Sequence, residues 1–272
     1  MRCSITRLFV TFTTFAILLC TPAVFAATET LRLFSSTSTR DSGLIAALIP
    51  EFEKQTGIYV DFKAASTGKA IRTARLGKLD LIWVHAPEAE KKVIADGFAT
   101  KRVVTMYNDF ILLGPPNDPA GIKNTKTATD ALQKIHSQKI LFVSRGDDSG
   151  TNKKELFIWK KTGIRPFGSW YFEMGAGMKK SILKASDIGA YILSDRGTWL
   201  ANKHLFNLSV LFEGDTDLIN TYSLLPINPE KFPNINTNGA ERFIDFVTRG
   251  KGRDIIENFT ISGNRLYKIK NK

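Results

Sequence analysis

Cysteine is nearly absent from the sequence. Its 272 residues include two cysteines, Cys3 and Cys20, and both lie within the first 26 residues. If those residues form a cleaved leader, the remaining chain has no disulfide and no thiol nucleophile. Histidine is also scarce, with three residues, and none stands at a spacing typical of a metal site. We therefore expect no disulfide scaffold, no thiol enzyme, no cofactor and no metal cation bound directly by side chains.

Long apolar runs are missing after residue 26, so no membrane span is expected there. The beginning of the chain is different. Arg2 and Arg7 form a basic start, residues 8–20 are almost wholly apolar or hydroxylic, and residues 24–26 form a small-residue cleavage site. This order of segments predicts a secretory signal peptide over residues 1–26.

Cleavage of this signal is expected after Ala26, with Ala27 as the second choice. Leu19 stands where a lipoprotein signal has a small residue, so we expect no lipid anchor at Cys20. The remaining chain of about 246 residues is long enough for two lobes or one large domain. We expect a soluble, exported protein that resides in the periplasm.

Acidic residues are few compared with basic ones. The formal net charge is +12, and it is +10 without Arg2 and Arg7, because the first 26 residues contain no Asp or Glu. The basic residues are scattered and form neither a dense block nor an aromatic-basic pattern, which disfavours nucleic acid as a partner. A positive field that steers small anions inward fits this distribution better.

Apolar runs alternate with amphipathic stretches along the chain, which predicts an α/β fold with mostly parallel sheets. Glycine and proline interrupt the pattern at residues 114–119, and residues 213–215 form a second break. These breaks indicate a middle segment inserted between two parts of the first domain. We expect two lobes with a ligand cleft between them: residues 27–113 with 214–272 form lobe 1, and residues 114–213 form lobe 2.

Two local expectations concern particular elements. Apolar residues recur every fourth position over residues 41–56, which predicts one amphipathic helix with Pro50 inside it. Residues 103–104 and 110–113 are both strand-like, and the polar residues between them predict two separate strands.

Three strand-to-helix turns share one chemistry. Residues 35–39, 66–69 and 144–151 each follow an apolar or alternating run, contain several hydroxyl residues, and precede a helical pattern. After the third turn we expect a helix with Asn152 and Glu155 as its capping pair. In an open α/β sheet such turns gather at the carboxyl ends of the strands. Their free N–H groups and hydroxyls suit a small oxyanion.

Serine, aspartate and glycine are also ordinary turn residues, and Arg145 by itself could be a solvated side chain. The convergence of three turns outweighs this simpler interpretation. Asp147 and Asp148 are harder to place, because a carboxylate repels a dianion unless it accepts a proton from it. Monohydrogen phosphate offers such a proton, so phosphate stays a rival ligand. We favour a structural role in which both aspartates orient Arg145 or cap the turn.

Eight segments of the chain carry a more specific pattern. They are residues 33–44, 67–70, 80–86, 106–110, 144–151, 175–178, 195–199 and 222–223. In this order, from about Leu31 to Phe259, they resemble the motifs of the TupA family, the substrate-binding component of a bacterial tungstate ABC importer. The resemblance implies a type II periplasmic binding protein fold, whose two lobes close on tungstate or molybdate and deliver it to an ABC permease at the inner membrane.

The chain departs from the family pattern at a few positions. The family's Thr-Thr-Thr-Ser motif falls on residues 35–38, with serine at two of the threonine positions. Ser66 replaces a glycine, Arg40 a tyrosine and Ala176 a glutamine. These departures could alter selectivity, and no side-chain ligand is expected at Ala176.

Tungstate and molybdate are aprotic tetrahedral dianions at neutral pH, so they require donors only. We expect donors from all three turns, with Arg145 as the charged partner and no catalytic residue. The expected ligand-binding residues are Thr37, Ser38, Ser66, Thr67, Ser144, Arg145 and Thr151. His85 follows a strand and has no cysteine to activate, so we expect it to be structural.

Two functions of another class remain open. A secreted phosphate-ester hydrolase would need a nucleophile with a base, or a metal cluster, and the sequence reveals neither. An exported ligand sensor would share the ligand site and differ only in its partner surface. Because tungstate and molybdate have nearly the same size and charge, only the resemblance favours tungstate. A monomer is expected, since binding proteins of this kind generally act singly.

Overall fold

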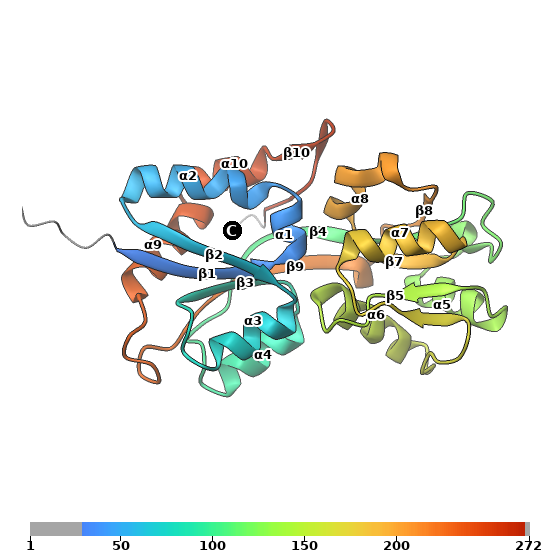
Figure 1. The fold of residues 1–272 in the computed structure, drawn as a ribbon, viewed down its shortest axis with the longest axis horizontal. Coiled ribbons are helices and arrows are strands. Elements are labelled where there is room, and N and C mark those ends of the chain that lie inside the picture. The colour runs from blue at the N-terminus through green and yellow to red at the C-terminus, as the bar shows by residue number, and fades with distance from the viewer. Residues whose placement is uncertain (1–28, 270–272) are drawn as a thin grey trace, which may run out of the picture.

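The computed structural model describes residues 29–269, which form two lobes side by side (Figure 1). The expected signal peptide, its cleavage site and both cysteines lie outside these residues. Within residues 29–269, no helix combines the length and the apolar character needed to cross a membrane.

Parallel strands form the centre of the lobe that contains the start of the described chain. β1 (Thr30–Ser36) lies between β2 (Tyr59–Ala65) and β3 (Leu81–Val84), and both pairings are parallel. Helices cover both faces of this sheet, which explains why all four residues of β3 are buried (Figure 1). These helices are α1 (Thr37–Asp41), α2 (Leu44–Thr56), α3 (Thr67–Ala74), α4 (Pro87–Ala95), α9 (Thr237–Thr248) and α10 (Lys251–Glu257).

The other lobe repeats this plan. β5 (Phe142–Ser144) lies between β6 (Tyr171–Glu173) and β7 (Tyr191–Asp195), again with parallel pairing. β8 (Ser209–Phe212) adds an antiparallel strand at β4. The helices of this lobe are α5 (Ala128–Ser137), α6 (Gly150–Lys161), α7 (Met178–Ile188) and α8 (Arg196–Asn202), with 3₁₀ turns at Ile122–Asn124, Lys203–Leu205 and Thr216–Leu218.

Two long antiparallel strands, β4 (Val103–Gly114) and β9 (Ile219–Pro226), run between the lobes (Figure 1). The resulting sheet has the order β2-β1-β3-β9-β4-β7-β5-β6, with β8 beside β4. A small hairpin of β10 (Thr260–Ile261) and β11 (Asn264–Arg265) follows α10. The predicted α/β class is confirmed, and the sheet is mixed because β4 and β9 run against their neighbours.

β4 also corrects a local expectation. Two separate strands are predicted at 103–104 and 110–113, whereas the structure has one continuous strand. The polar residues between the two runs continue the ladder, since Asn108 pairs with Asn220 of β9. Their side chains are hydrogen-bonded as well: Asn220 Nδ2 donates to Asn108 Oδ1 at 2.8 Å.

The predicted helix over residues 41–56 is wrong at its start. The structure divides this stretch into the end of α1 and the whole of α2, separated by Ser42 and Gly43. Gly43 has a φ of 87°, a left-handed conformation that interrupts a helix and that glycine adopts at low cost. Pro50 lies inside α2, as expected.

Each lobe has apolar clusters on both faces of its sheet. Trp83 of β3 joins the cluster that includes Phe243 of α9, whereas its neighbour Ile82 joins the cluster beneath α3. In β4 the same alternation sends Phe110 and Ile111 to two different clusters of the other lobe. This alternation follows from the two-residue period of a strand that is covered on both sides. The lobe boundaries given above, 27–113 with 214–272 and 114–213, remain our proposal.

Candidate functional site

All three hydroxyl-rich turns form helix starts at the junction of the lobes. Ser36, Ser66 and Ser149 are the N-caps of α1, α3 and α6, and each accepts a hydrogen bond from the backbone N–H three residues later. The expected capping pair of Asn152 and Glu155 is therefore wrong. Ser149 accepts the N–H of Asn152 at 3.2 Å, and the helix begins earlier, at Gly150.

The second and third turns meet across the junction. The Gly68 N–H at the start of α3 donates to the backbone oxygen of Asp148 at 3.1 Å, and Arg72 Nη1 lies 2.9 Å from Asp148 Oδ2. Gly150 lies against the ring of His85, and a Cβ there would be 2.5 Å from His85 Cε1. The two lobes are thus in direct contact, and glycine is required where their backbones approach most closely.

The first turn joins this region through a stack of rings. The Ser38 hydroxyl lies beside that of Tyr222, whose pKa it lowers against the larger effect of burial. The ring of Tyr222 stacks on His85 with 4.9 Å between centroids. Since His85 also touches Gly150, the structure brings the first turn to the same region as the other two.

Arg145 is a buried cation at the centre of the third turn. Its side chain is 3% exposed, and its Nη2 lies 2.5 Å from Asp147 Oδ2. The other carboxylate oxygen of Asp147 accepts the N–H of Ser149 at 3.2 Å. Asp148 forms ion pairs with Arg72 and Lys153, and these partners hold its pKa below the usual value although partial burial opposes them. Asp147 therefore has the structural role that we favoured. The Asp148 side chain, by contrast, neither contacts Arg145 nor caps the turn and instead pairs with Arg72 and Lys153.

Several buried donor atoms in this region have no hydrogen-bond partner among the described residues. They include Thr67 Oγ1, Arg145 Nε, Thr151 Oγ1 and Asn108 Nδ2. Buried polar atoms in proteins are nearly always hydrogen-bonded, so such a group requires an explanation. Thr67 belongs to one lobe and Arg145 and Thr151 to the other, which suits an acceptor-rich molecule between the lobes. Sequence reasoning missed Asn108, because an asparagine within a strand carries no motif.

Three of the remaining expected residues, Ser38, Ser66 and Ser144, form hydrogen bonds within the protein. Ser38 Oγ lies 2.9 Å from Ser36 Oγ, and Ser66 is half-buried and caps α3. Ser144 is fully buried at the end of β5, and its hydroxyl donates to Glu155 Oε2 at 2.7 Å. Thr37 lies at the border of a groove between the lobes. The structure therefore places all seven residues at the junction, but their roles as ligands remain a proposal.

His85 has the structural surroundings that we expected. Burial lowers its pKa to about 4, the nearby charge of Arg145 contributes to that decrease, and the hydrogen bond between His85 Nδ1 and Asn220 Oδ1 opposes it. The imidazole is therefore neutral at pH 7. Within the described part of the chain, no group of three or more His, Cys, Asp or Glu side chains is arranged to hold a metal ion.

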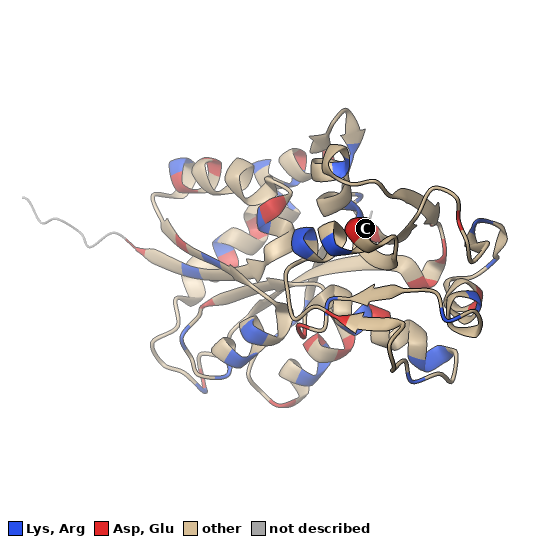
Figure 2. Cartoon of the chain, turned by 45° about the vertical axis from the view of Figure 1, so that its right-hand side comes forward, with Lys and Arg blue, Asp and Glu red and all other residues tan. Residues whose placement is uncertain are grey.

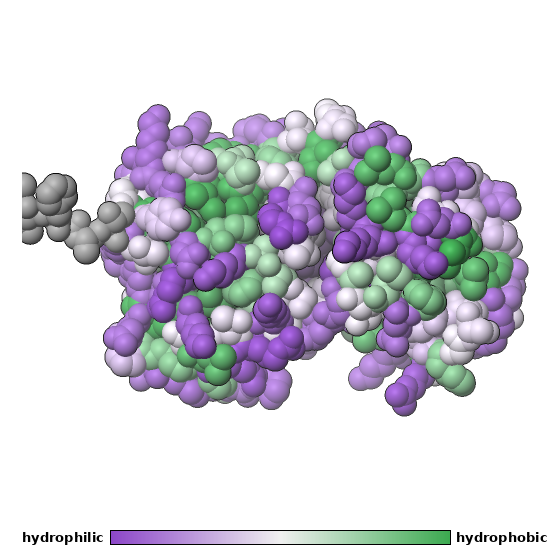
Figure 3. Space-filling model, viewed as in Figure 1, coloured by the Kyte–Doolittle hydropathy of each residue, from purple (hydrophilic) through white to green (hydrophobic). Residues whose placement is uncertain are grey.

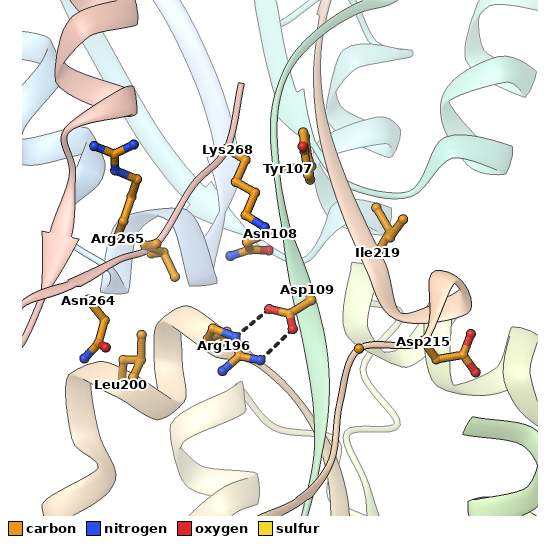
Figure 4. A pocket seen from close by; sticks show the side chains of 12 residues that line it. Tyr107, Asn108, Asp109, Arg196, Leu200, Asp215, Ile219, Asn264, Arg265 and Lys268 are labelled. Carbon is orange, nitrogen blue, oxygen red and sulfur yellow. Dashed lines mark hydrogen bonds and ion pairs between the residues drawn. The ribbon is translucent and has the colours of Figure 1, made fainter. Parts of the chain in front are cut away.

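Two cavities lie close to the junction. A groove of about 790 Å³ runs between the start of α1 and residues 175–180, and Figure 3 shows hydrophilic residues on both of its sides. A cavity of about 520 Å³ lies at the strands between the lobes. Figure 4 shows Asp109 and Arg196 pointing toward each other there, with Lys268 from the C-terminal segment nearby. None of the seven expected residues lines this second cavity.

Lysine and arginine positions are distributed over helices of both lobes (Figure 2). This distribution agrees with the scattered lysines and arginines of the sequence. Arg145 differs from them by its burial. The positive charge that an anion would contact directly is thus local, whereas the surface charge acts at longer range.

This arrangement of two α/β lobes, joined by two strands and facing each other with helix starts, defines a two-lobed solute-binding protein. A family model described as PBP superfamily domain matches residues 24–251. The chain is 44% identical over 246 residues to a putative ABC transporter anion-binding protein of Haloferax volcanii, with 89% of this chain and 72% of the relative covered.

Two further relatives are more specific. The tungstate-binding protein TupA of Peptoclostridium acidaminophilum is 43% identical over 226 residues, which cover 82% of this chain and 79% of that protein. A solved structure described as the tungstate ABC transporter from Geobacter sulfurreducens is 44% identical, with a TM-score of 0.78 and coverage of 86% of this chain and 100% of that one. The chain belongs to the TupA family of the PBP superfamily, a family of solute-binding proteins.

Proposed function

We propose that this protein captures tungstate, with molybdate as the second candidate, between its two lobes. The observation that carries the proposal is the set of buried donors without partners, Thr67 Oγ1 on one lobe and Arg145 Nε and Thr151 Oγ1 on the other. An aprotic tetrahedral dianion supplies acceptors in several directions and can satisfy donors from both sides. The names of two relatives, which specify tungstate, support the choice of ligand.

The surroundings of the two aspartates favour an aprotic anion over monohydrogen phosphate. Asp147 is occupied by Arg145 and by the Ser149 N–H, and Asp148 is occupied by Arg72 and Lys153. These partners weaken both carboxylates as acceptors for a proton of the ligand. Weaker carboxylate acceptors favour an anion that carries no proton.

The chemistry of the ligand contacts would be hydrogen bonding through oxygen. Arg145 supplies one buried charge, and the starts of α3 and α6 add backbone N–H groups and the positive ends of two helix dipoles. Thr37, Ser38, Ser66 and Ser144 complete the proposed set of contacts. The ligand would hold the lobes together because it contacts both only when they are close.

The same proposal covers the setting of the protein. The chain is exported by a signal peptide cleaved after Ala26, acts as a monomer in the periplasm, and delivers its ligand to an ABC permease. The description of a solved relative as an ABC transporter supports this partner. We assign binding and no catalysis to the site.

Calorimetric titration of the chain that begins at Ala27 tests the function with tungstate, molybdate, sulfate and phosphate. We expect tight tungstate binding that Arg145→Ala weakens by at least tenfold, since a charge-assisted hydrogen bond contributes about 1.5–3 kcal/mol. Arg249→Ala is the matched control, because Arg249 is exposed, pairs with Asp245 of α9 and lies outside the proposed set of contacts. Stronger binding of phosphate than of tungstate would contradict the proposal, and silence with all four anions would refute it.

A secreted phosphate-ester hydrolase remains the second candidate because of one contact. Ser144 donates to Glu155 at 2.7 Å, and burial raises the pKa of Glu155 to about 7, as a nucleophile with a base would require. Turnover of a chromogenic phosphate ester, abolished by Ser144→Ala, would establish this activity. We expect no turnover, and instead a loss of anion affinity in the same variant.

A further inference from the structure

The hydroxyl proton of Ser144 is committed to another side chain. Ser144 Oγ donates to Glu155 Oε2 at 2.7 Å and accepts from Asn152 Nδ2 at 3.3 Å. A serine hydroxyl has a single proton, so in this arrangement it presents only a lone pair to any further neighbour. That lone pair would repel an oxygen atom of an aprotic anion. Ser144 can therefore donate to the proposed ligand only if its O–H bond turns away from Glu155.

The carboxylate of Glu155 is hydrogen-bonded unsymmetrically. Tyr171 donates to Oε1 at 2.6 Å, and Trp159 Nε1 donates to the same oxygen at 3.3 Å. Oε2 has Ser144 as its neighbour. With two donors already on Oε1, a proton on this carboxyl group belongs on Oε2, where it points at Ser144 Oγ. The geometry thus defines both the site of protonation and the group that responds to it.

We propose that Glu155 is a positioning residue for the bound oxyanion, because a proton on its Oε2 turns the Ser144 hydroxyl away from the carboxyl group and toward the anion. This inference deepens the proposed function and rests on it, since it concerns the same site. In the ionised state Ser144 donates to Glu155. In the protonated state Glu155 donates to Ser144 Oγ, and the Ser144 proton becomes available to the ligand. The exchange takes one proton from solvent and forms an O–H bond at Glu155 Oε2. The Ser144 O–H bond stays intact and only changes its direction.

This exchange also sets the selectivity of the site. With Glu155 ionised, the free lone pair of Ser144 can accept a proton from a ligand that carries one. With Glu155 protonated, Ser144 becomes a donor and favours an anion without protons. A single buried carboxyl group thus decides which of the two classes of oxyanion Ser144 suits.

The environment of Glu155 allows both states near neutral pH. Glu155 is 2% exposed, and this burial raises the pKa of its carboxyl group to about 7. The groups that face it are Ser144 from β5, Tyr171 and Glu173 from β6, and Trp159 from its own helix. The hydrogen bonds of Tyr171, Ser144 and Trp159 lower this pKa, whereas the charge of Glu173 raises it.

The sign of the pH effect follows from linkage. Binding of the anion favours protonated Glu155, so the pKa of Glu155 is higher in the complex than in the free protein. Affinity is then highest below the free pKa of about 7 and decreases as the pH rises through it. The decrease approaches about tenfold per pH unit, the limit for one proton taken up per ligand.

Calorimetric titration with tungstate and with sulfate, about one pH unit below and one above this pKa, tests the inference. Both anions lack protons in this range, so any change of affinity with pH arises from a group of the protein. In Glu155→Gln the amide nitrogen can donate to Ser144 while the amide oxygen accepts from Tyr171, which imitates the protonated state. We expect this variant to retain, above the pKa, the affinity that the unmodified chain has below it.

Two controls separate this role from a structural one. Ser144→Ala removes the group that responds, so we expect weaker binding that no longer depends on pH. Glu173→Gln removes an exposed carboxylate of β6 whose charge raises the pKa of Glu155. This variant should keep the decrease in affinity with rising pH, but at lower pH values. A pH slope that persists in Glu155→Gln would overturn the inference, as would the absence of a slope in the unmodified chain that nonetheless binds. Absence of binding at every pH would instead refute the proposed function.

If Glu155→Gln does not fold, Tyr171→Phe provides an independent test. This substitution removes a donor to the ionised carboxylate and therefore raises the pKa of Glu155. We expect the decrease in affinity to begin at a higher pH than in the unmodified chain. An unchanged midpoint in a folded Tyr171→Phe variant would also overturn the inference.

Discussion

Replacing Gly150 with alanine would test whether the contact between the lobes is the ligand-binding state. Gly150 begins α6, and a Cβ at this position would lie 2.5 Å from His85 Cε1, well inside van der Waals contact. The His85 ring is held in place by stacking on Tyr222, at 4.9 Å between centroids, and by a 2.8 Å hydrogen bond to Asn220. The start of α6 must therefore withdraw, and the lobes separate where the ligand would lie.

The size of the effect follows from two opposing contributions. Overpacking of this kind costs about 1–3 kcal/mol, and here the cost arises only when the lobes are in contact. Alanine is also a better helix former than glycine by about 1 kcal/mol, but this gain is the same whether the lobes touch or not. We therefore expect tungstate affinity to decrease about 5- to 150-fold, while the ligand-free chain, whose lobes can separate, loses no thermal stability.

The assay combines calorimetric titration with small-angle scattering. The radius of gyration of Gly150→Ala should exceed that of the unmodified chain when no ligand is present, and tungstate should reduce the difference. Gly177→Ala is the matched control, because Gly177 also precedes a helix at the junction and an added Cβ there meets no atom within 4 Å. An unchanged affinity in Gly150→Ala would refute the assignment of this contact to the ligand-bound state.

Two further predictions concern stability. Burial lowers the pKa of His85 to about 4 and raises that of Glu155 to about 7, so His85 adds stability as pH rises from about 4 to 6.5 while Glu155 removes it from about 4.5 to 7. Each effect amounts to about 3 kcal/mol, and the two largely cancel. Denaturant unfolding at several pH values checks this: relative to the unmodified chain, the free energy of unfolding should rise with pH for Glu155→Gln and fall with pH for His85→Gln. Curves parallel to that of the unmodified chain would contradict the prediction. Trp159→Ala should lower the free energy of unfolding by about 3–5 kcal/mol because Trp159 is 1% exposed. Phe167→Ala is its control, since Phe167 is 78% exposed and its loss should change this free energy by less than about 0.5 kcal/mol. Equal losses in the two variants would contradict the assignment of the core.

The three turns could be predicted because their chemistry is local. A hydroxyl residue at the end of an apolar run can cap the helix that follows, and Ser36, Ser66 and Ser149 all do so. That all three turns gather in one place follows from the α/β topology, which orders the ends of the strands. For the same reason, the α/β class could be predicted from alternating patterns alone.

Other features depend on contacts that are distant in the sequence. The role of Glu155 could not be predicted because Glu155 lies in α6 and its partner Tyr171 lies 16 residues away in β6. In a helical pattern, Glu155 is most simply interpreted as a capping residue. Asn108 interrupts an apolar run, which indicates the end of a strand unless its partner Asn220, 112 residues away, is known. In both cases a remote side chain supplies a hydrogen bond to the buried polar residue.

The combination of a neutral histidine with Arg145, the one buried arginine of residues 29–269, explains how this site selects its anion. Burial, with a smaller contribution from the charge of Arg145, lowers the pKa of His85, so the imidazole stays uncharged beside Arg145 at neutral pH. Asp147 further offsets the charge of Arg145 at 2.5 Å. A dianion between the lobes therefore meets one positive charge that is partly offset, and the rest of its binding depends on hydroxyl and N–H donors with fixed directions. Such donors respond to the shape and protonation of a ligand, whereas several lysines would attract any small anion.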